Sequence, residues 1–266
     1  NINFTERLMG GDVPNIIGPR DFSSHYHTKK GKNSYTVKGG QKYTSPGSIN
    51  AQGDCSSAAF WLCADALAAN VVLRGLDENC PQGDRHVTDI LERFGAKKIV
   101  SKEGISFEAG RLKGIEIDAS DIPDLVPILS VVACAARGKT TIYGAKRLRL
   151  KESDRLETTR DFLTRLGAKV EITEDGLVIE GSGKLEGGNY KIRGDVSSQF
   201  ITGLIFALVY LGEDSTIEIL PPLESRPYID LTVSALQAFC ADVKFKNEYQ
   251  IEIKKAKMHA FSGKIE

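Results

Sequence analysis

The sequence lacks an excess of charge of either sign. Its 266 residues include 35 lysines and arginines and 35 aspartates and glutamates. Binding to nucleic acid or to an acidic membrane surface rests on a basic excess, so the composition supports neither kind of partner. Any anionic ligand must therefore be bound by local groups of cations.

The sequence also lacks a cysteine framework and a long hydrophobic run. Its five cysteines include no Cys-x-x-Cys pair, which fits reduced, mostly buried thiols rather than disulfides or a metal site. The longest apolar run, residues 200–211, is shorter than a membrane span and contains Thr202 and Gly203. Residues 1–11 carry Glu6 and Arg7 and no long apolar core, unlike a signal peptide. We therefore expect a cytoplasmic protein without a membrane partner.

The two ends of the chain have little periodicity. Residues 1–34 contain glycine and proline but no sustained hydrophobic pattern, so we predict an arm or loop there, and a tail at residues 254–266. His25 and His27 could bind a metal from one strand, but no cysteine or carboxylate has a supporting spacing. We therefore predict no metal site.

A strong helix signal lies between Arg147 and Gly167. Asp154 is a good N-cap with Glu157 at capping-box spacing, and Gly167 stands where a terminal glycine belongs. The helix start carries Lys151 and Arg155 beside unpaired backbone N–H groups, which is typical of an anion site. A solvated, charged helix start is the alternative interpretation.

The order of predicted elements recurs three times. Residues 35–110, 111–187 and 188–253 each read β-α-β-α-β-β, and the residues that close the second helix of each copy are 72 (167 − 95) and 73 (240 − 167) positions apart. Each copy contains one very apolar helix that it cannot cover alone. We therefore predict an α/β (α+β) fold with pseudo-threefold symmetry, in which the apolar helices lie inside and the sheets outside.

The elements of these copies can be placed from patterns and turn residues. The predicted helices follow Asp54, Asp124, Asp154 and Ser198 or cover residues 85–94 and 228–239, and the predicted strands lie at residues 35–38, 70–76, 97–100, 105–107, 140–143, 169–179, 215–220, 244–245 and 251–253, the 169–179 segment being a hairpin.

An approximate rotation would bring the N-terminal ends of the three apolar helices together. Those ends are residues 54–57, 121–124 and 195–199, which carry serine hydroxyls and backbone donors suited to phosphate or carboxylate. Asp124 and Glu152 lie among the cations near these ends and could act as general base and acid. The residues alone thus indicate binding of a small polyanionic metabolite and proton chemistry on it.

Five stretches make a specific resemblance. They are YTVKGGQKYTSPGSINAQGDCSSAAFWL, QGDRHVTDILERFGAK, IDASDIPDLVPILSVVACAARGKTTI, LRLKESDRL with GLVIEG, and GDVSSQFITGLIFAL with LESRPYIDLT. Over residues 35–253 the chain resembles 5-enolpyruvylshikimate-3-phosphate synthase, an enolpyruvyl transferase of the shikimate pathway and aromatic amino acid biosynthesis. The family carries the enolpyruvyl group of phosphoenolpyruvate to the 5-hydroxyl of shikimate 3-phosphate, with six β-α-β-α-β-β units in two domains.

The resemblance implies a role for nine residues and requires no cofactor. Ser197, Ser198 and Ser225 would hold the phosphate of shikimate 3-phosphate, and Gln199 and Tyr228 would line that substrate. Asp124 would take the proton from the attacking hydroxyl, and Glu152 would transfer a proton at the methylene carbon. Lys151 would contact both substrates, and Arg155 would pair with phosphoenolpyruvate.

The sequence departs from the family pattern in two ways. It contains no glycine-flanked Ser-Lys-Ser, no Asn-Ala-Gly-Thr and no Asp-His-Arg segment, which in the family surround phosphoenolpyruvate. The Ser197 unit also follows the Lys151 unit instead of preceding the Gly53 unit, and we expect it to close one pseudo-threefold domain. Two alternatives to a shikimate-type transferase are a nucleotide-sugar enolpyruvyl transferase and a non-catalytic anion-binding module of three repeats. The oligomeric state has no sequence signal.

Overall fold

The structure is a computed structural model of the chain. It describes residues 22–27, 34–40, 42, 45, 47–48, 52–67, 69–77, 79–150, 154–183, 187–195, 197–211 and 213–255. Residues 53–78 and 84–266 belong to one compact unit, and residues 1–52 and 79–83 belong to another. The site lies in the first of these, which contains the second and third predicted repeats and residues 53–78 and 84–110 of the first.

Two complete repeats have the same order of elements. The second repeat consists of β5 (Glu116–Asp118), α4 (Val126–Ala135) after the short helix η2 (Pro123–Leu125), β6 (Arg137–Tyr143), η3 (Lys146–Leu150), α5 (Arg155–Arg165), β7 (Lys169–Ile172) and β8 (Leu177–Ser182). The third consists of β9 (Asn189–Arg193), α6 (Ser198–Leu211), β10 (Ser215–Leu220), α7 (Arg226–Ala238), β11 (Asp242–Asn247) and β12 (Gln250–Lys254). Both read β-α-β-α-β-β, as predicted.

The sheets of these two repeats are also equivalent. One has the order β5-β6-β8-β7 and the other β9-β10-β12-β11 when read from its first strand. In each sheet the first two strands along the chain, β5 and β6 or β9 and β10, are parallel. The fourth strand along the chain, β8 or β12, lies between the second and the third and is antiparallel to both. The strands alternate buried and exposed residues, because one face covers the core and the other meets solvent.

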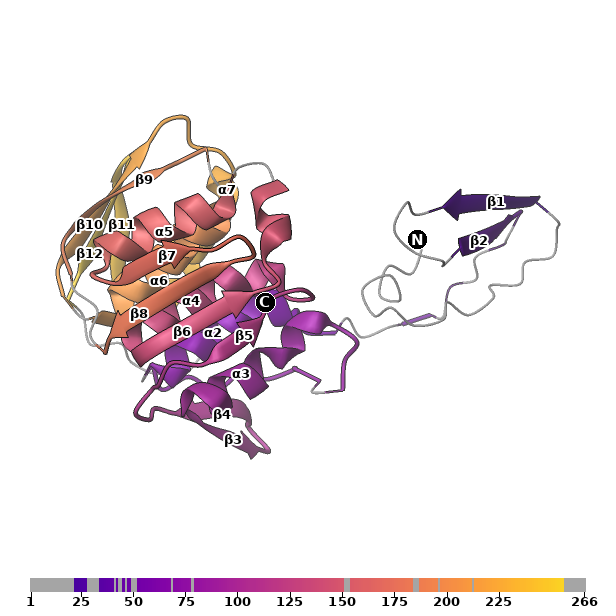
Figure 1. Ribbon diagram of the computed structural model, residues 1–266, viewed down its shortest axis with the longest axis horizontal. Helices are drawn as coiled ribbons and strands as arrows, with labels where there is room; N and C mark the ends of the chain where they lie inside the picture. The colour runs from indigo at the N-terminus through magenta and orange to yellow at the C-terminus, as the bar shows by residue number, and fades with distance from the viewer. Residues whose placement is uncertain are drawn as a thin grey trace. The chain divides into compact units, whose positions relative to one another are not determined.

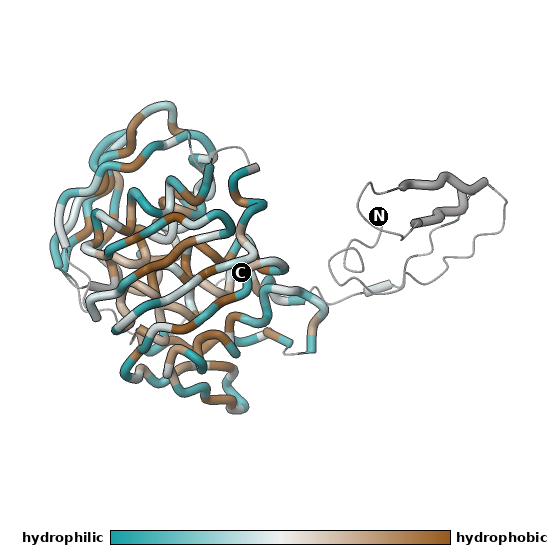
Figure 2. Tube along the Cα trace, in the orientation of Figure 1, coloured by the Kyte–Doolittle hydropathy of each residue, from teal (hydrophilic) through white to brown (hydrophobic). Residues whose placement is uncertain are grey.

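The apolar helices of the three repeats form the centre of the core. The helices α2 (Cys55–Ala66), α4 and α6 pack against one another, and α4 is buried at every position from Val126 to Cys134. Trp61 of α2 meets Phe206 of α6 edge to face, with ring centroids 5.0 Å apart. Figure 1 shows α4 and α6 behind the β5–β8 sheet, and Figure 2 shows hydrophobic residues gathered there. The prediction of helices inside and sheets outside is confirmed.

The second helix of each repeat ends in the same way. Gly95 after α3 (Val87–Phe94), Gly167 after α5 and Cys240 after α7 all have positive φ, at 111°, 88° and 61°. The next residue in each case, Ala96, Ala168 or Ala241, donates a backbone hydrogen bond of 3.1 Å to the helix carbonyl five residues before it. This is the Schellman termination, which needs a left-handed residue. The spacing of 72 and 73 positions therefore marks structurally equivalent residues.

The first repeat is less regular than the other two. It contains α2, η1 (Gly83–His86), α3 and the hairpin of β3 (Lys97–Ser101) with β4 (Gly104–Glu108). The strand predicted at residues 70–76 is wrong, since only Leu73 pairs there, as an isolated antiparallel bridge to Ile105. Asn70 and Gly75 have φ of 59° and 81°, which interrupts an extended run.

The N-terminal strands differ from expectation as well. The strand predicted at residues 35–38 exists as β2 (Ser34–Gly39), but its partner is β1 (Phe22–His27) in a two-stranded antiparallel sheet. β1 falls within the segment where an arm or loop was predicted. Its sequence, FSSHYH, has no clear alternation, so only the pairing with β2 identifies it as a strand.

Candidate functional site

The N-terminal end of α2 is held by Asp54. Its carboxylate accepts hydrogen bonds from the backbone N of Ser56 (3.0 Å) and from Oγ of Ser57 (2.5 Å). Asp54 has extended backbone angles, as an N-cap requires, so its side chain satisfies two donors of the first turn. The sequence left Asp54 and Ser56 as alternative caps of this helix, and in the structure the cap is Asp54.

Arg155 connects the ends of the other two apolar helices. Its Nη1 donates to Oδ1 of Asp124, which precedes α4, at 3.0 Å, and to Oε1 of Gln199, in the first turn of α6, at 3.1 Å. Arg155 itself is the first residue of α5, where Asp154 caps the helix by accepting from the backbone N–H groups of Leu156 and Glu157. Three predicted site residues from three helix starts therefore lie within hydrogen-bond distance.

Arg155 is a buried cation. Its side chain is 7% exposed, whereas that of Asp124 is 42% exposed. A guanidinium in this position needs a carboxylate, because an uncompensated charge is costly to bury. Asp124 therefore supplies a counter-charge to Arg155 from 31 positions away, a pairing that no spacing rule in the sequence predicts.

Asp84 brings the end of α2 into the same region. Its carboxylate accepts a hydrogen bond from Oγ of Ser56, across from η1 to α2. Burial raises the pKa of Asp84, the bond from Ser56 lowers it, and the charges of Asp124 and Asp54 raise it further. The helix α2 packs against η2, which leads into α4, so the starts of α2 and α4 are neighbours. Asp84 is not among the predicted site residues, because its partner Ser56 lies 28 positions away in the sequence.

The serines predicted to hold a phosphate lie in two segments, one at the start of α6 and one in the loop before α7, and a hydrogen bond joins these segments. Ser197 and Ser198 are half-buried at the start of α6. The backbone N of Glu224 donates to the carbonyl of Gly194 at 2.9 Å, which ties the loop before α7 to the loop before α6. Ser225 follows in that loop with a positive φ of 55° and is exposed, and Tyr228 is 66% exposed.

Gly194 allows this contact between loops. A Cβ at Gly194 would lie 2.6 Å from the carbonyl oxygen of Pro222 and 2.9 Å from that of Leu220. Any other residue would push the loop that carries Ser225 away from the α6 start.

Lys151 and Glu152, two of the three predicted catalytic residues, lie outside the described residues.

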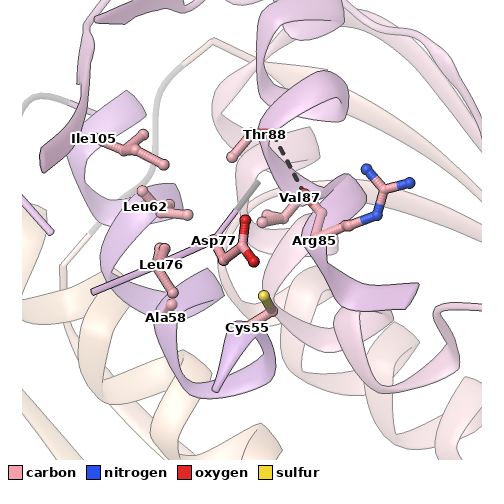
Figure 3. A pocket seen from close by; sticks show the side chains of 9 residues that line it. All are labelled: Cys55, Ala58, Leu62, Leu76, Asp77, Arg85, Val87, Thr88 and Ile105. Atoms are coloured by element: carbon pink, nitrogen blue, oxygen red, sulfur yellow. Dashed lines mark hydrogen bonds between the residues drawn. The ribbon is translucent and has the colours of Figure 1, made fainter. Parts of the chain in front are cut away.

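A small pocket lies beside the start of α2, shown in Figure 3. It is lined mainly by apolar groups of α2, α3 and β4, together with Cys55, Asp77 and Arg85. The guanidinium of Arg85 points away from it, and the Arg85 carbonyl accepts from Oγ1 of Thr88 at 3.3 Å. Its internal volume of about 20 Å³ has room for about one water molecule.

The described residues contain neither a candidate metal site nor a candidate membrane-spanning helix. Among them, no three His, Cys, Asp or Glu side chains are grouped so as to hold a metal ion. No helix in the described part of the chain is long and apolar enough to cross a membrane.

The sequence profile that describes EPSP synthase (3-phosphoshikimate 1-carboxyvinyltransferase) matches residues 20–191 and 179–263. The chain belongs to this family. A curated relative, the 3-phosphoshikimate 1-carboxyvinyltransferase of Methanocorpusculum labreanum, is 41% identical over 177 residues, which cover 65% of this chain and 42% of the relative. The enzyme of the same name from Clostridium acetobutylicum is 45% identical over 159 residues, 60% of this chain and 36% of the relative.

Solved structures agree with the family assignment. EPSP synthase from Acinetobacter baumannii has a TM-score of 0.54 and 27% identity, covering 78% of this chain and 46% of that one. The enolpyruvyl transferase NikO from Streptomyces tendae, with a TM-score of 0.52 and 17% identity, shares the fold and covers 79% of this chain and 48% of that one. The chain therefore has the enolpyruvyl transferase fold and spans less than half the length of these relatives.

Proposed function

We propose that this chain takes part in the transfer of the enolpyruvyl group from phosphoenolpyruvate to the 5-hydroxyl of shikimate 3-phosphate, with release of phosphate. One observation carries the proposal. Arg155, Asp124 and Gln199, to which the family resemblance gives roles in this reaction, come from three different helix starts and meet through two hydrogen bonds of 3.0 and 3.1 Å. Structural packing alone does not require these three residue types at the starts of α4, α5 and α6.

The chemistry of the reaction matches these groups. The hydroxyl oxygen must bond to the enol carbon, so a base has to accept its proton; Asp124, with a half-exposed carboxylate, is the proposed base. The neighbouring methylene carbon must accept a proton, for which Glu152 is proposed. Phosphate then leaves and a proton is lost from the methyl carbon, which restores the carbon–carbon double bond.

The remaining residues are proposed to bind the substrates. Ser197, Ser198 and Ser225 would donate to the phosphate of shikimate 3-phosphate, with Gln199 and Tyr228 along its ring. Lys151 would contact both substrates. Arg155 already bonds Asp124 and Gln199 through Nη1, and its guanidinium has five N–H donors, so it would orient Asp124 and also bind phosphoenolpyruvate. We place this chemistry in the cytoplasm, and no cofactor is part of it.

The second candidate is an anion-binding module without turnover. It is favoured by the absence of the Ser-Lys-Ser, Asn-Ala-Gly-Thr and Asp-His-Arg segments from the 266 residues, since their cations surround phosphoenolpyruvate in the family. A nucleotide-sugar transferase is disfavoured by the Lys151–Arg155 and Ser197–Phe200 stretches, which are of the shikimate type.

Two measurements on the full chain separate these candidates. Calorimetric titration gives the binding of shikimate 3-phosphate, and a phosphate-release assay with phosphoenolpyruvate gives turnover. Binding with turnover supports the transferase, and binding without turnover supports the module. The site assignment fails if Lys151→Ala and Glu152→Ala both leave binding and turnover unchanged.

A further inference from the structure

Ser225 has an unusual conformation at the start of α7. It precedes the first residue of the helix, and its backbone is left-handed, with φ of 55° and ψ of 29°. A serine at this position ordinarily has an extended backbone and caps the helix with its hydroxyl, but the Ser225 side chain makes no cap hydrogen bond. A residue other than glycine keeps such a conformation only where the surrounding contacts hold it. The neighbours of Ser225 therefore decide where its hydroxyl lies.

Backbone hydrogen bonds fix the chain on both sides of Ser225. The N–H of Glu224 donates to the carbonyl of Gly194 at 2.9 Å, and the N–H of Tyr228 donates to the carbonyl of Ser225 at 3.1 Å. The first bond attaches the loop to the segment before α6, and the second closes the first turn of α7. The side chain of Arg226, the first residue of α7, adds an attachment to the sheet.

The guanidinium of Arg226 has three contacts. Its Nε donates to Oδ1 of Asp230, one turn further along α7, at 2.9 Å. Its Nη1 donates to the carbonyl of Glu248, in the turn between β11 and β12, also at 2.9 Å. Its Cζ lies 3.8 Å from the centroid of the Phe245 ring in β11. A planar guanidinium that bonds two acceptors and stacks on a ring has a fixed orientation, so it joins the first turn of α7 to the β11–β12 hairpin.

The second repeat has a similar attachment. There Nη2 of Arg149 donates to the carbonyl of Thr173, in the turn between β7 and β8, at 3.1 Å. Its Nη1 donates to Oδ2 of Asp154, the cap of α5, at 3.3 Å. In both complete repeats an arginine thus ties the start of the second helix to the turn of the closing hairpin. These are the helix starts at which Arg155 and Ser225, two proposed substrate-binding residues, lie.

We propose that Arg226 is a positioning residue for Ser225, which it holds in the left-handed conformation that directs the serine hydroxyl to the phosphate of shikimate 3-phosphate. The inference rests on the proposed function, in which Ser225 is one of three serines that bind this phosphate. Arg226 acts through the backbone of Ser225 and not on the substrate, since its Nε, its Nη1 and a face of its guanidinium are already engaged. Without this attachment only a fraction of the molecules would have Ser225 in the binding conformation, and the apparent affinity would fall by that fraction.

The first test needs neither ligand nor turnover. In the full chain labelled with ¹³C and ¹⁵N, the one-bond Cα–Hα coupling of Ser225 distinguishes positive from negative φ. Arg226→Met keeps an apolar stem but has no donor, so the coupling should move toward that of an extended residue. Asp230→Asn keeps an acceptor oxygen without the charge and should give a smaller change in the same direction.

Arg160→Met is the matched control for this measurement, because it removes an arginine from the exposed side of α5. It should leave the Ser225 coupling at the wild-type value. A Ser225 coupling that is the same in the wild-type chain, Arg226→Met and Asp230→Asn overturns the proposal. Should Arg226→Met fail to fold, the comparison of Asp230→Asn with the wild-type chain decides alone.

The second test is calorimetric titration with shikimate 3-phosphate. The penalty of the left-handed conformation for a residue with a Cβ corresponds to about fivefold to thirtyfold in population, so Arg226→Met should weaken binding by about that factor. Arg160→Met should leave the affinity unchanged. When Ser225→Gly is already present, Arg226→Met should cause a loss of less than about twofold, because glycine adopts the left-handed conformation readily.

The outcomes of this titration are distinct. Equal losses from Arg226→Met with and without Ser225→Gly would mean that Arg226 acts on the phosphate itself, which contradicts a positioning role. Absence of binding to the wild-type chain would instead refute the proposed function, and the NMR coupling would still decide whether Arg226 holds Ser225.

Discussion

Nη1 of Arg155 lies 3.0 Å from Oδ1 of Asp124, although 31 positions separate the two residues in the sequence. The cation is the buried partner, and the carboxylate is half-exposed. Arg155→Ala should lower the free energy of unfolding by about 2–3 kcal/mol, less than for a fully buried pair because water reaches the carboxylate left behind. Urea denaturation followed by circular dichroism measures this change.

The same helix offers a control for this substitution. Arg160 pairs with Glu157 and Asp161 on the exposed side of α5, so Arg160→Ala should leave the urea midpoint almost unchanged. Equal midpoints for Arg155→Ala and Arg160→Ala would show that the buried pair has no special contribution. Arg155→Lys tests whether the planar arrangement of the guanidinium donors matters. A lysine keeps the charge but has one ammonium group, so it should recover only part of the stability lost in Arg155→Ala.

Cys240 occupies a backbone conformation that suits glycine. Its φ of 61° corresponds to 111° at Gly95 and 88° at Gly167 in the other repeats. A left-handed residue with a Cβ costs about 1–2 kcal/mol, and glycine loses about 0.5–1 kcal/mol more backbone entropy on folding, so Cys240→Gly should stabilise the chain by about 0.5–1 kcal/mol. Thermal and urea unfolding measure the difference.

The reverse substitution completes this test. A Cβ at Gly167 would meet no atom within 4 Å, so only the backbone conformation opposes a side chain there. Gly167→Ala should therefore destabilise by about 1 kcal/mol. A Cys240→Gly variant that is less stable than wild type would mean that the thiol contributes packing that outweighs the strain.

These left-handed positions explain why the sequence predicted so much of the fold. A helix that ends in a Schellman turn needs glycine or its equivalent at a fixed place, so the repeat left a measurable spacing even though most side chains differ. The strand prediction at residues 70–76 was wrong because valine and leucine favour a strand, whereas Asn70 and Gly75 have positive φ, which a strand does not allow. β9 was missed although Tyr190 and Ile192 alternate with exposed residues, a pattern that identifies a short strand.

The site was predictable only where a residue acts locally. The caps Asp54 and Asp154 follow from neighbouring backbone donors, which sequence spacing reveals. The bonds of Arg155 to Asp124 and Gln199 span 31 and 44 positions, and the bond between Ser56 and Asp84 spans 28. No spacing rule predicts such contacts, since they depend on how the three repeats pack.

Asp65 is a buried carboxylate outside the proposed site. It is 1% exposed within α2 and accepts hydrogen bonds from the backbone N of Val71, at 2.7 Å, and of Phe107. Asp65→Ala should destabilise by about 3 kcal/mol, because these buried donors would have no acceptor. Urea unfolding gives the loss, and hydrogen exchange should show faster exchange of the Val71 and Phe107 amides.

A conservative variant distinguishes hydrogen bonding from packing at this position. Asp65→Asn keeps one acceptor oxygen and nearly the same volume, so it should lose less stability than Asp65→Ala. If both variants lost the same amount, or if Asp65→Ala cost less than about 1 kcal/mol, the carboxylate would not be the group that anchors residues 71 and 107.

Asp84 and Asp118 should give stability changes of opposite sign with pH. Burial first, and then the charges of Asp124 and Asp54, raise the pKa of Asp84, so the folded chain holds this proton more tightly than the unfolded chain, where the pKa is about 3.9. The stability linked to Asp84 is complete below about pH 3.9 and is lost as pH rises through the folded-state value. Asp84→Asn cannot ionise, so its stability relative to wild type should rise over that window and then level off.

Hydrogen bonds from Ser120 lower the pKa of Asp118, so its contribution is present above the unfolded-state value and is lost as pH falls. The stability of Asp118→Asn relative to wild type should therefore increase only as the pH falls into the acid range. Urea unfolding of the three proteins from about pH 3 to pH 8 provides the comparison. Parallel curves for Asp84→Asn and wild type would mean that burial and the neighbouring carboxylates do not act on Asp84 in solution, because any difference in proton affinity between the folded and unfolded chains must appear as a slope.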